Sequence, residues 1–328
     1  PPSPLPHRHS PPLPLHQAAA ARDSLVKIMY SRLFTWMVGR ITGATSRPEA
    51  SKRYIGLLDV YGFEFFDVNS FEQLCINFAN EKLQQFFLVT VFTAEEQVYK
   101  DEGVPWTPIP YADNKLVISI IEEQPEGIYP TLDSMCRTGN STGRQFCAAL
   151  HEIAAKRKAK DKKFDVLGAP KINRKESRTK EDHFLIKHFA ADVVYHCGEF
   201  LEKNNDSLDQ GLQQMVLNSS KPIIVEVCTP EAEPASAAKK GPAKKGTSSF
   251  GSVGTKFCKS LNALMKELES SQAHFIRCIK PNPELVPKKI HGEQGISRDL
   301  SLDRARNLVR AFGLLITASE VIVCDYSK

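Results

Sequence analysis

Two acidic residues and a glycine stand close together in the stretch YIGLLDVYGFEFF, in the order that a nucleoside-triphosphate site uses. Asp59 ends an apolar run, Gly62 follows three residues later, and Glu64 comes two after that. A carboxylate at the end of a buried strand can reach the Mg²⁺ of a bound nucleotide, directly or through water. A glycine beside it lets a backbone N–H approach a γ-phosphate, and a nearby glutamate can hold the loop closed or position water. The pattern alone is weak evidence, because an acid followed by a glycine at a strand end is often only a turn.

The elements around this stretch would position its side chains. The run RYIGLLDV predicts a buried strand before the loop, since it is too uniformly apolar for a surface strand. Ser70 and Gln73 form a capping-box pair that begins a helix. Apolar residues at helical spacing continue toward Tyr99, which predicts a helix roughly 40 Å long. Such a helix suits an element that connects distant parts. Its apolar positions are Phe71, Leu74, Cys75, Phe78, Leu83, Phe86 and Phe87.

The rest of the chain alternates between predicted helices and strands, which favours an α/β fold. The proline-dense first residues predict a disordered tail, and a helix is expected from about Asp23 until Gly39 and Gly43 end it. Three prolines around Trp106 stop the long helix. Further helices are expected over 114–123, 142–158, within 203–220, over 255–269 and over 302–315. Strands are expected within 183–196 and 274–281. The segment 156–180 is expected to be a basic loop, and 231–254 a flexible linker.

Composition restricts the class of protein. The 328 residues carry a net charge of +5, and the segment 156–180 alone holds 11 basic and 3 acidic residues. Such a patch suggests an acidic partner, although a solvated basic loop is commoner. Eight scattered cysteines without a C-x-x-C pair predict reduced thiols in a cytosolic protein. No run reaches the length of a membrane span, and no signal-peptide layout is present at the start.

The longer context of the acid–glycine pattern resembles the myosin motor domain. DVYGFEFFDVNSFEQLCINFANEKLQQFF is similar to switch II followed by the relay helix of that family, and ARDSLVKIMYSRLFTWMVGRI to the helix before it. EGVPWTPI resembles the relay loop and GIYPTLDSMC the actin-contacting helix–loop–helix. FLEKNND and SLNALMKELESSQAHFIRCIKPN resemble two further hallmark stretches. The resemblance follows the family's order from about Ala21 to Asn282.

The resemblance implies a role for each residue of the pattern. Asp59 would face Mg²⁺ and its waters, the Gly62 amide would bind the γ-phosphate of ATP, and Glu64 would pair with an arginine of switch I. The helix from Phe71 to Tyr99 would relay this closure to a converter and lever. The implied relay positions are Phe71, Phe78, Phe86 and Trp106, and the alternative for their aromatic rings is plain core packing.

Actin filaments are the partner that the resemblance implies. The expected surface runs from Gly127 to Met135, with Ile128, Tyr129 and Leu132 as its apolar contacts. The basic segment 156–180 would match one charged surface loop of the family, and a second would carry Lys239, Lys240, Lys244 and Lys245. Because actin is acidic, flexible lysines would raise the encounter rate and make binding salt-sensitive. Taken singly, each lysine is equally well explained as a solvated surface residue.

The resemblance also divides the chain. Residues 1–20 would be proline-rich and unlike the family, and 21–328 a partial motor domain. Within it lie the switch II region (54–69), relay helix (70–100), relay loop (101–112), actin-binding region (114–155), basic surface loop (156–182), lysine-containing loop (229–256), a helix and strand of the transducer region (257–282) and a divergent reactive-thiol helix region (300–328).

Two parts of the family's nucleotide site have no match in this sequence, namely the Gly-Lys-Ser/Thr phosphate-binding loop and switch I. The nearest stretch, GPAKKGTS at 241–248, has Thr where the lysine should stand and follows a low-complexity linker instead of a strand. NLVRAFGLL starts like the reactive-thiol helices, but the residues after it diverge, and no light-chain-binding helix is recognisable. The predicted fold is therefore an incomplete P-loop NTPase-type motor domain, with strands of a central mixed sheet and many surrounding helices.

Three functional hypotheses remain open at this point. The first is part of an actin-based motor that uses ATP and Mg²⁺ in the cytoplasmic actin cytoskeleton, with this chain alone unable to hydrolyse ATP. The second is a non-catalytic actin-binding fragment. A nucleic-acid binder ranks last, because no aromatic residues interleave with the basic loops and no recognised module is present.

Overall fold

The computed structural model describes residues 15–46, 55–105, 113–170, 179–205, 210–229, 252–277 and 319–325. The chain divides into two compact units. The first comprises Pro1–Ala50 and Asp206–Gly251, and the second comprises Ser51–Asn205 and Ser252–Lys328. The predicted site residues that the structure describes all belong to the second unit.

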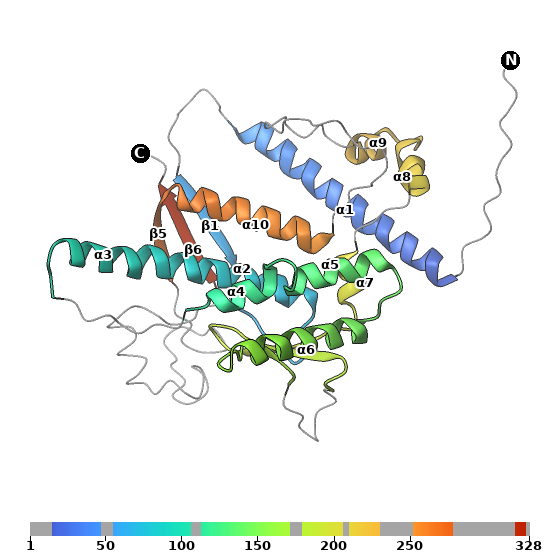
Figure 1. Cartoon of the computed structure of the whole chain (residues 1–328). Helices are drawn as coiled ribbons and strands as arrows, with labels where there is room; N and C mark the ends of the chain where they lie inside the picture. The colour runs from blue at the N-terminus through green and yellow to red at the C-terminus, as the bar shows by residue number, and fades with distance from the viewer. Residues whose placement is uncertain are drawn as a thin grey trace, which may run out of the picture. The chain divides into compact units, whose positions relative to one another are not determined.

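A three-stranded antiparallel sheet lies in the second unit, with β1 (Ile55–Tyr61) at one edge, β6 (Ser319–Asp325) in the middle and β5 (Gln272–Arg277) at the other edge (Figure 1). Asp59 is paired with Val321, and Ile276 with the same residue from the other side. The described strands of this sheet are thus all antiparallel to their neighbours, which corrects the expectation of a mixed sheet.

One face of this sheet is covered by two helices, α2 (Phe71–Phe87) and α10 (Val253–Glu269). Alternate residues of β1 point to that face, where Leu58 and Val60 pack against a cluster built on Leu83, Phe86, Met265 and Leu268. Successive side chains of a strand point to opposite faces. The other alternate residues of β1 are therefore on the far face, and Ile55, Leu57 and Tyr61 are 74%, 72% and 78% exposed.

The strand β1 is consequently not buried as its sequence predicts. A uniformly apolar strand is expected where both faces are covered. In the described part of the chain, β1 is an edge strand with one covered face. This arrangement leaves the Asp59 side of the strand accessible.

The long helix predicted after the loop is present. It runs through α2, a π-helical segment (Leu88–Thr93) and α3 (Ala94–Asp101), as Figure 1 shows. Ser70 precedes it as the N-cap, and its backbone N–H donates to the Gln73 side chain at 2.9 Å, as in a capping box. π-helical segments are rare and occur often at functional sites.

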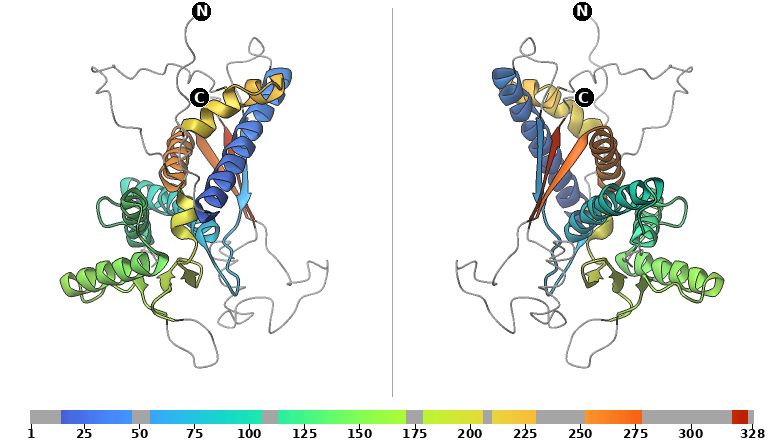
Figure 2. Two further views of the ribbon diagram at one scale, coloured as in Figure 1. Left: turned by 90° about the vertical axis from the view of Figure 1, so that its right-hand side faces the viewer. Right: turned by 90° about the vertical axis from the view of Figure 1, so that its left-hand side faces the viewer.

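The main core of the second unit lies between α2 and a layer of helices and a small sheet (Figure 2). Its largest fully buried side chains include Phe78, Phe146, Phe184, Tyr195 and Phe200. The elements that contribute are α4 (Lys115–Glu122), α5 (Ile128–Thr138), α6 (Gly143–Lys160), β2 (Leu167–Gly168), β3 (His183–Lys187), β4 (Asp192–His196) and α7 (Phe200–Asn204), with the strands in the antiparallel order β2-β3-β4.

The first unit contains α1 (Leu15–Thr45), α8 (Gln210–Leu217) and α9 (Pro222–Cys228). Side chains of α1 and α9 line an apolar pocket of about 360 Å³, and Trp36 Nε1 donates to Glu226 Oε1 at 3.0 Å. The helix α1 is longer than predicted. It begins inside the proline-rich segment and continues through Gly39 and Gly43, where glycine costs about 1 kcal/mol each but does not end a helix.

Two other boundaries differ from the sequence-based expectations. The basic segment 156–180 is not wholly a loop, since α6 continues to Lys160 and Leu167–Gly168 pairs with β3. The expected linker ends early, because Ser252 caps α10 by accepting a hydrogen bond from the Thr255 N–H at 3.0 Å. The helix expected over 302–315 lies outside the described residues.

Candidate functional site

The loop from Gly62 to Ser70 joins β1 to α2 and carries two of the three residues that could contact a phosphate. Asp59 lies on the exposed face of β1, Gly62 is buried, and Glu64 is partly buried. The Glu64 carboxylate accepts a hydrogen bond from Gln73 Nε2 at 3.4 Å, so the residue that caps α2 also reaches the candidate acid. The acid and the helix start are therefore connected locally.

Two asparagines on α2 hold the main chain of this region. Asn77 binds Glu64 at both backbone groups, since its Oδ1 accepts from the Glu64 N–H at 3.0 Å and its Nδ2 donates to the Glu64 C=O at 2.8 Å. Asn80 Nδ2 donates to the Tyr61 C=O at 3.0 Å. Asparagine suits this role because its amide both donates and accepts. Any movement of the loop along the chain direction must move α2 or break these bonds.

A third asparagine fastens the loop to β4. Asn69 is buried; its Oδ1 accepts from the Phe66 N–H at 2.7 Å, and its Nδ2 donates to the Val194 C=O at 3.0 Å. The Asn69 C=O in turn accepts from the His196 N–H at 2.8 Å. The loop is thus held between the helix and the small sheet.

Behind Asn77 lies a fully buried polar network. Asn77 Nδ2 hydrogen-bonds to the Tyr195 hydroxyl at 3.0 Å, and that hydroxyl lies 2.8 Å from His188 Nε2. His188 Nδ1 is 2.9 Å from Glu81 Oε1, which also accepts from the Phe189 N–H at 3.0 Å. Buried polar networks of this kind are rigid when each member is satisfied. Burial also raises the pKa of Tyr195, so its hydroxyl keeps its proton.

The aromatic residues of the long helix are core residues. Phe71 and Phe78 each pack edge-on against Tyr129, with ring centroids 6.2 and 5.7 Å apart, and Phe86 lies 5.6 Å from Phe275. Core packing and a transmitting role for the whole helix are compatible. Trp106 lies outside the described residues.

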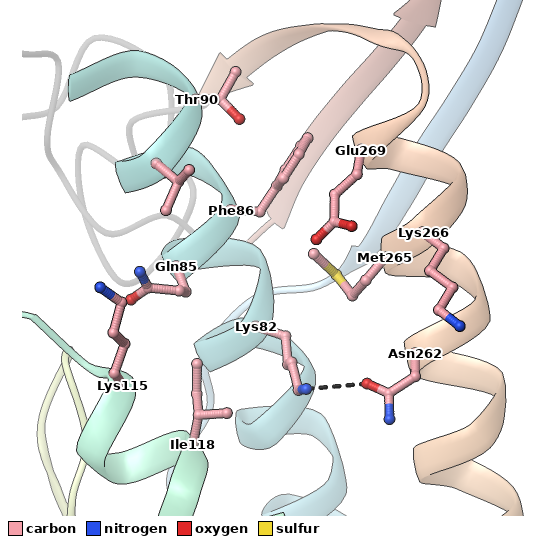
Figure 3. Close-up of a pocket in the computed structure, with 11 residues that line it drawn as sticks. Lys82, Gln85, Phe86, Thr90, Lys115, Ile118, Asn262, Met265, Lys266 and Glu269 are labelled. Carbon is pink, nitrogen blue, oxygen red and sulfur yellow. Dashed lines mark hydrogen bonds between the residues drawn. The ribbon is translucent and has the colours of Figure 1, made fainter. Parts of the chain in front are cut away.

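A pocket of about 710 Å³ lies beside the long helix where its α-helical part changes to the π-helical segment (Figure 3). Phe86, Ile118 and Met265 supply apolar walls. Lys82 Nζ donates to Asn262 Oδ1 at 3.0 Å and also pairs with Glu122. These contacts join α2 to α10 and to α4. The same helices, with the π-helical segment, line the pocket.

The predicted actin-contacting stretch forms the start of α5, and its apolar residues do not lie on the surface. Ile128, Tyr129 and Leu132 are 0%, 3% and 0% exposed, Gly127 is buried, and Met135 is partly buried. The expectation that they make an exposed apolar patch is therefore wrong. They pack into the core because they follow the inner face of α5 at helical spacing. Ser134, Arg137 and Thr138 are the exposed residues of the same helix.

Buried polar contacts fix α5 against α7 and α10. Asn204 Nδ2 donates to Asp133 Oδ1 at 2.9 Å, and Asn204 Oδ1 accepts from the Gly254 N–H at 2.8 Å. Thr255 Oγ1 also binds Asp133. The start of α10 is thus tied to the helix of the predicted actin-contacting stretch. Lys239, Lys240, Lys244 and Lys245 lie outside the described residues.

The residues present suit one side of a Mg²⁺–phosphate site. Carboxylate oxygens are preferred Mg²⁺ ligands, and Asp59 is accessible on its strand. Among the described residues, however, no group of three or more His, Cys, Asp or Glu side chains is placed to hold a metal ion. In the same part of the chain, no helix has the length and apolar composition needed to cross a bilayer. The described residues do not make a complete nucleotide site.

Asp59 near the end of β1, the short loop after it and the long helix that holds this loop by hydrogen bonds lie among helices and small sheets. The sequence predicted an acid, a loop and a long helix in this order for a motor-type α/β domain. A protein-family model described as "Myosin head (motor domain)" matches residues 8–302 of the sequence. The chain belongs to this family.

Three curated relatives illustrate the match. The chain is similar to "Myosin heavy chain 95F" of Drosophila melanogaster, with 38% identity over 88% of this chain and 22% of that protein. It is similar to "Myosin-16" of Arabidopsis thaliana, with 39% identity over 82% and 20%. For "Myosin-I heavy chain" of Dictyostelium discoideum the identity is 36%, over 84% and 11%. The chain thus spans less than a quarter of the length of these relatives.

Several residues of the site were not found from the sequence. Asn69, Asn77 and Asn80 were read only as parts of a motif, and Tyr195 and His188 only as strand-like residues. A signal did exist for Asn77 and Asn80, since amides on the otherwise apolar face of a helix need partners when buried. Nothing in the sequence indicated that Asn69 would bind Val194 or that Asn77 would bind Tyr195, since each pair is separated by more than 100 residues.

Proposed function

We propose that this chain is part of an actin-based motor that couples ATP hydrolysis to movement, and that its strand-end loop responds to the γ-phosphate. The observation that carries the proposal is the pair of hydrogen bonds by which Asn77 grips both backbone groups of Glu64. A phosphate that draws in the Gly62 amide would displace Glu64, and Asn77 would pass that displacement to the long helix. ATP and Mg²⁺ are the cofactors that the family uses.

In this proposal Asp59, Gly62 and Glu64 have the roles that the family resemblance implies. Asp59 would supply an oxygen ligand to Mg²⁺ or its waters, and the Gly62 N–H would donate to the phosphate. Glu64, held by Gln73, would close the loop against an arginine. When bound, Mg²⁺ supplies the positive charge that stabilises the transferring phosphoryl group. Since no Gly-Lys-Ser/Thr loop is in this sequence, we propose that the chain by itself does not hydrolyse ATP.

A nucleotide-binding measurement tests this part of the proposal. We expect fluorescent mant-ATP with Mg²⁺ to show no saturable binding to the 328-residue chain, because most of the electrostatic stabilisation of a triphosphate comes from the phosphate-binding loop and its lysine. Saturable binding that is lost in Asp59→Ala would contradict it and would show that the chain holds a usable site.

The actin surface that we propose uses the exposed side of α5 and the basic segment 156–180, which begins in the last turn of α6. Ser134 and Arg137 are exposed on α5, and Lys156, Lys160 and Lys163 are exposed in the basic segment. Actin filaments are acidic, so these charges would favour association and make it sensitive to salt. The second candidate function is actin binding without ATP hydrolysis. For the chain taken alone this function is favoured because its sequence contains no Gly-Lys-Ser/Thr phosphate-binding loop. Either function places the protein on the cytoplasmic actin cytoskeleton.

Co-sedimentation with actin filaments tests the surface. We expect the double variant Lys160→Glu, Lys163→Glu to bind about 5- to 10-fold more weakly than the wild-type chain at low salt, with a smaller difference at high salt. The matched control is the double variant Lys27→Glu, Lys221→Glu, which reverses the charge of two exposed lysines in the other unit. Equal weakening by both changes would mean that net charge alone acts. Binding to RNA that equals binding to actin would support the nucleic-acid hypothesis instead.

A further inference from the structure

A pair of histidines lies on the face of the small sheet that is turned away from the main core. His183 on β3 and His196 on β4 are partners in the antiparallel register. Their neighbours Phe184 and Tyr195 are fully buried. Since successive side chains of a strand point to opposite faces, the two histidines lie on the outer face, where both are partly exposed. The nucleotide and actin proposals use neither imidazole.

The backbone brings these two side chains close together. The Cys197 N–H donates to the Asp182 C=O at 2.8 Å. The His196 N–H donates to the Asn69 C=O and not to β3. In an antiparallel ladder, the pair beside a hydrogen-bonded pair is non-hydrogen-bonded, and its side chains are closer. His183 and His196 form such a pair, and their ring centroids are 4.9 Å apart.

We propose that His183 and His196 together chelate one divalent transition-metal ion such as Zn²⁺, with water completing its coordination. Imidazole nitrogens suit Zn²⁺, Cu²⁺ and Ni²⁺, whereas Mg²⁺ prefers oxygen ligands. With metal–nitrogen bonds of about 2 Å, two imidazoles on a tetrahedral ion have ring centroids roughly 5 Å apart. The observed separation of 4.9 Å is close to that of a chelate. The site does not depend on the motor function.

Asp182 determines which nitrogen of His183 is available to an ion. Asp182 Oδ1 lies 2.8 Å from His183 Nδ1, and the Thr179 C=O lies 3.2 Å from the same nitrogen. The Thr179 N–H is 3.3 Å away, but the charged carboxylate is the stronger partner. The ring proton therefore sits on Nδ1, and Nε2 keeps its lone pair. A carboxylate behind a histidine is the usual arrangement at metal sites, where it orients the ring.

The ring of His196 stays beside His183 because residue 198 has no side chain. A Cβ atom at Gly198 would lie 2.6 Å from His196 Cε1 and 3.2 Å from its Nδ1. A larger residue at this position would push the imidazole away. Gly198 thus leaves the space that the second ligand of the chelate occupies.

The proposed site has two protein ligands and not more. Among the described residues, no group of three or more His, Cys, Asp or Glu side chains is placed to hold an ion. The nearby acids have partners of their own, since Asp182 binds His183 and Glu199 pairs with Lys203 at 2.8 Å. Structural zinc sites have four protein ligands and supply folding energy. A chelate of two imidazoles is weaker, so we expect the chain to fold without the ion.

Calorimetric titration of the 328-residue chain with zinc chloride tests the chelate. His183→Gln and His196→Gln should each weaken binding at least about ten-fold, because two ligands on one scaffold bind an ion far more tightly than one. His274→Gln removes an exposed histidine of β5 and is the matched control, which should bind as the wild type does. Equal binding by all three variants, or equal binding of Mg²⁺ and Zn²⁺, would overturn the proposal.

The absorption spectrum with Co²⁺ in place of Zn²⁺ separates this chelate from binding by thiols. Cys147 and His151 lie on the neighbouring helix α6, with Sγ 3.4 Å from Nε2. Imidazole and water give Co²⁺ only weak visible bands, whereas a thiolate ligand adds an intense charge-transfer band in the near ultraviolet. We expect weak bands alone, and the same spectrum for Cys147→Ser. An intense band that Cys147→Ser removes would assign the ion to the thiol and contradict the chelate.

Chemical modification of the wild-type chain needs no variant that must fold. Diethyl pyrocarbonate acylates unprotonated imidazole nitrogens, and a bound ion blocks the nitrogen that it occupies. With free Zn²⁺ at ten times its Kd, we expect His183 and His196 to react about ten-fold more slowly, because mass action leaves about a tenth of the sites free. His274 should react at an unchanged rate. Mass spectrometry of proteolytic peptides measures each rate. Equal slowing at His274, or no slowing at the pair, would refute the proposal.

Discussion

At the scale of single residues, Tyr195 does more than pack as a strand residue, because its hydroxyl connects side chains of α2 and the small sheet region. Its hydroxyl bridges the Asn77 amide and the His188 imidazole, and it is completely buried. Asn77 also binds the backbone of Glu64, so the position of the candidate acid depends on a side chain more than 100 residues later. The loop is fixed by long-range contacts as much as by its own sequence.

Tyr195→Phe should therefore destabilise the chain by about 1–3 kcal/mol, since it leaves a buried amide N–H and an imidazole nitrogen without a partner. Urea unfolding followed by circular dichroism measures the change in the free energy of unfolding. Tyr61→Phe is the matched control, because Tyr61 is 78% exposed, and we expect a change within about 0.5 kcal/mol. Similar small effects at both positions would show that the network adds little to stability.

At the scale of elements, the close approach of α4 and α5 depends on Gly127. A Cβ atom at this residue would meet the Glu123 carbonyl oxygen at 2.6 Å and the Glu123 nitrogen at 2.9 Å. Both are backbone atoms, so the two helices would have to separate. We expect Gly127→Ala to lower the free energy of unfolding by about 1–3 kcal/mol.

The control for this change is Gly168→Ala. No atom lies within 4 Å of a Cβ at Gly168, so we expect an effect within about 0.5 kcal/mol by the same urea measurement. A larger effect at Gly168 than at Gly127 would contradict the steric explanation.

Elements with strong local signals were predictable from the sequence. The capping pair at Ser70 and the apolar spacing behind it predicted the long helix, and the structure confirms it. The strand β6 was missed, although SEVIVCD has the β-branched residues typical of strands, because the segment was judged by its divergence from a family pattern. The burial of Tyr129 was missed since a helix face has no fixed direction until its partners are known.

At the scale of the whole molecule, the two units differ in how much apolar surface they bury. The second unit has a continuous core in which many side chains, such as Phe78 and Leu132, are inaccessible. In the described part of the first unit, Val216 and Cys228 are the buried hydrophobic residues, while Tyr30, Phe34 and Ile41 on α1 are 71%, 62% and 59% exposed. Burial of apolar area is the main source of folding stability, so the second unit should be the more stable one.

Hydrogen exchange can measure this difference residue by residue, since amides in well-packed elements open only with the largest free-energy cost. We expect the amides of α2, α5 and β3 to exchange at least about ten-fold more slowly than those of α1 and α9. Timed labelling of the intact chain, followed by quenching, digestion and mass spectrometry of the peptides, measures this difference. Elements of similar helical length, such as α6 and α10, serve as controls within the second unit and should lie near α2. Uniform protection of α1 and α2 would contradict the expectation, because it would mean that both units open in one cooperative step. Slow exchange confined to the second unit would show that the loop after β1 and the long helix rest on a core that is stable without the first unit.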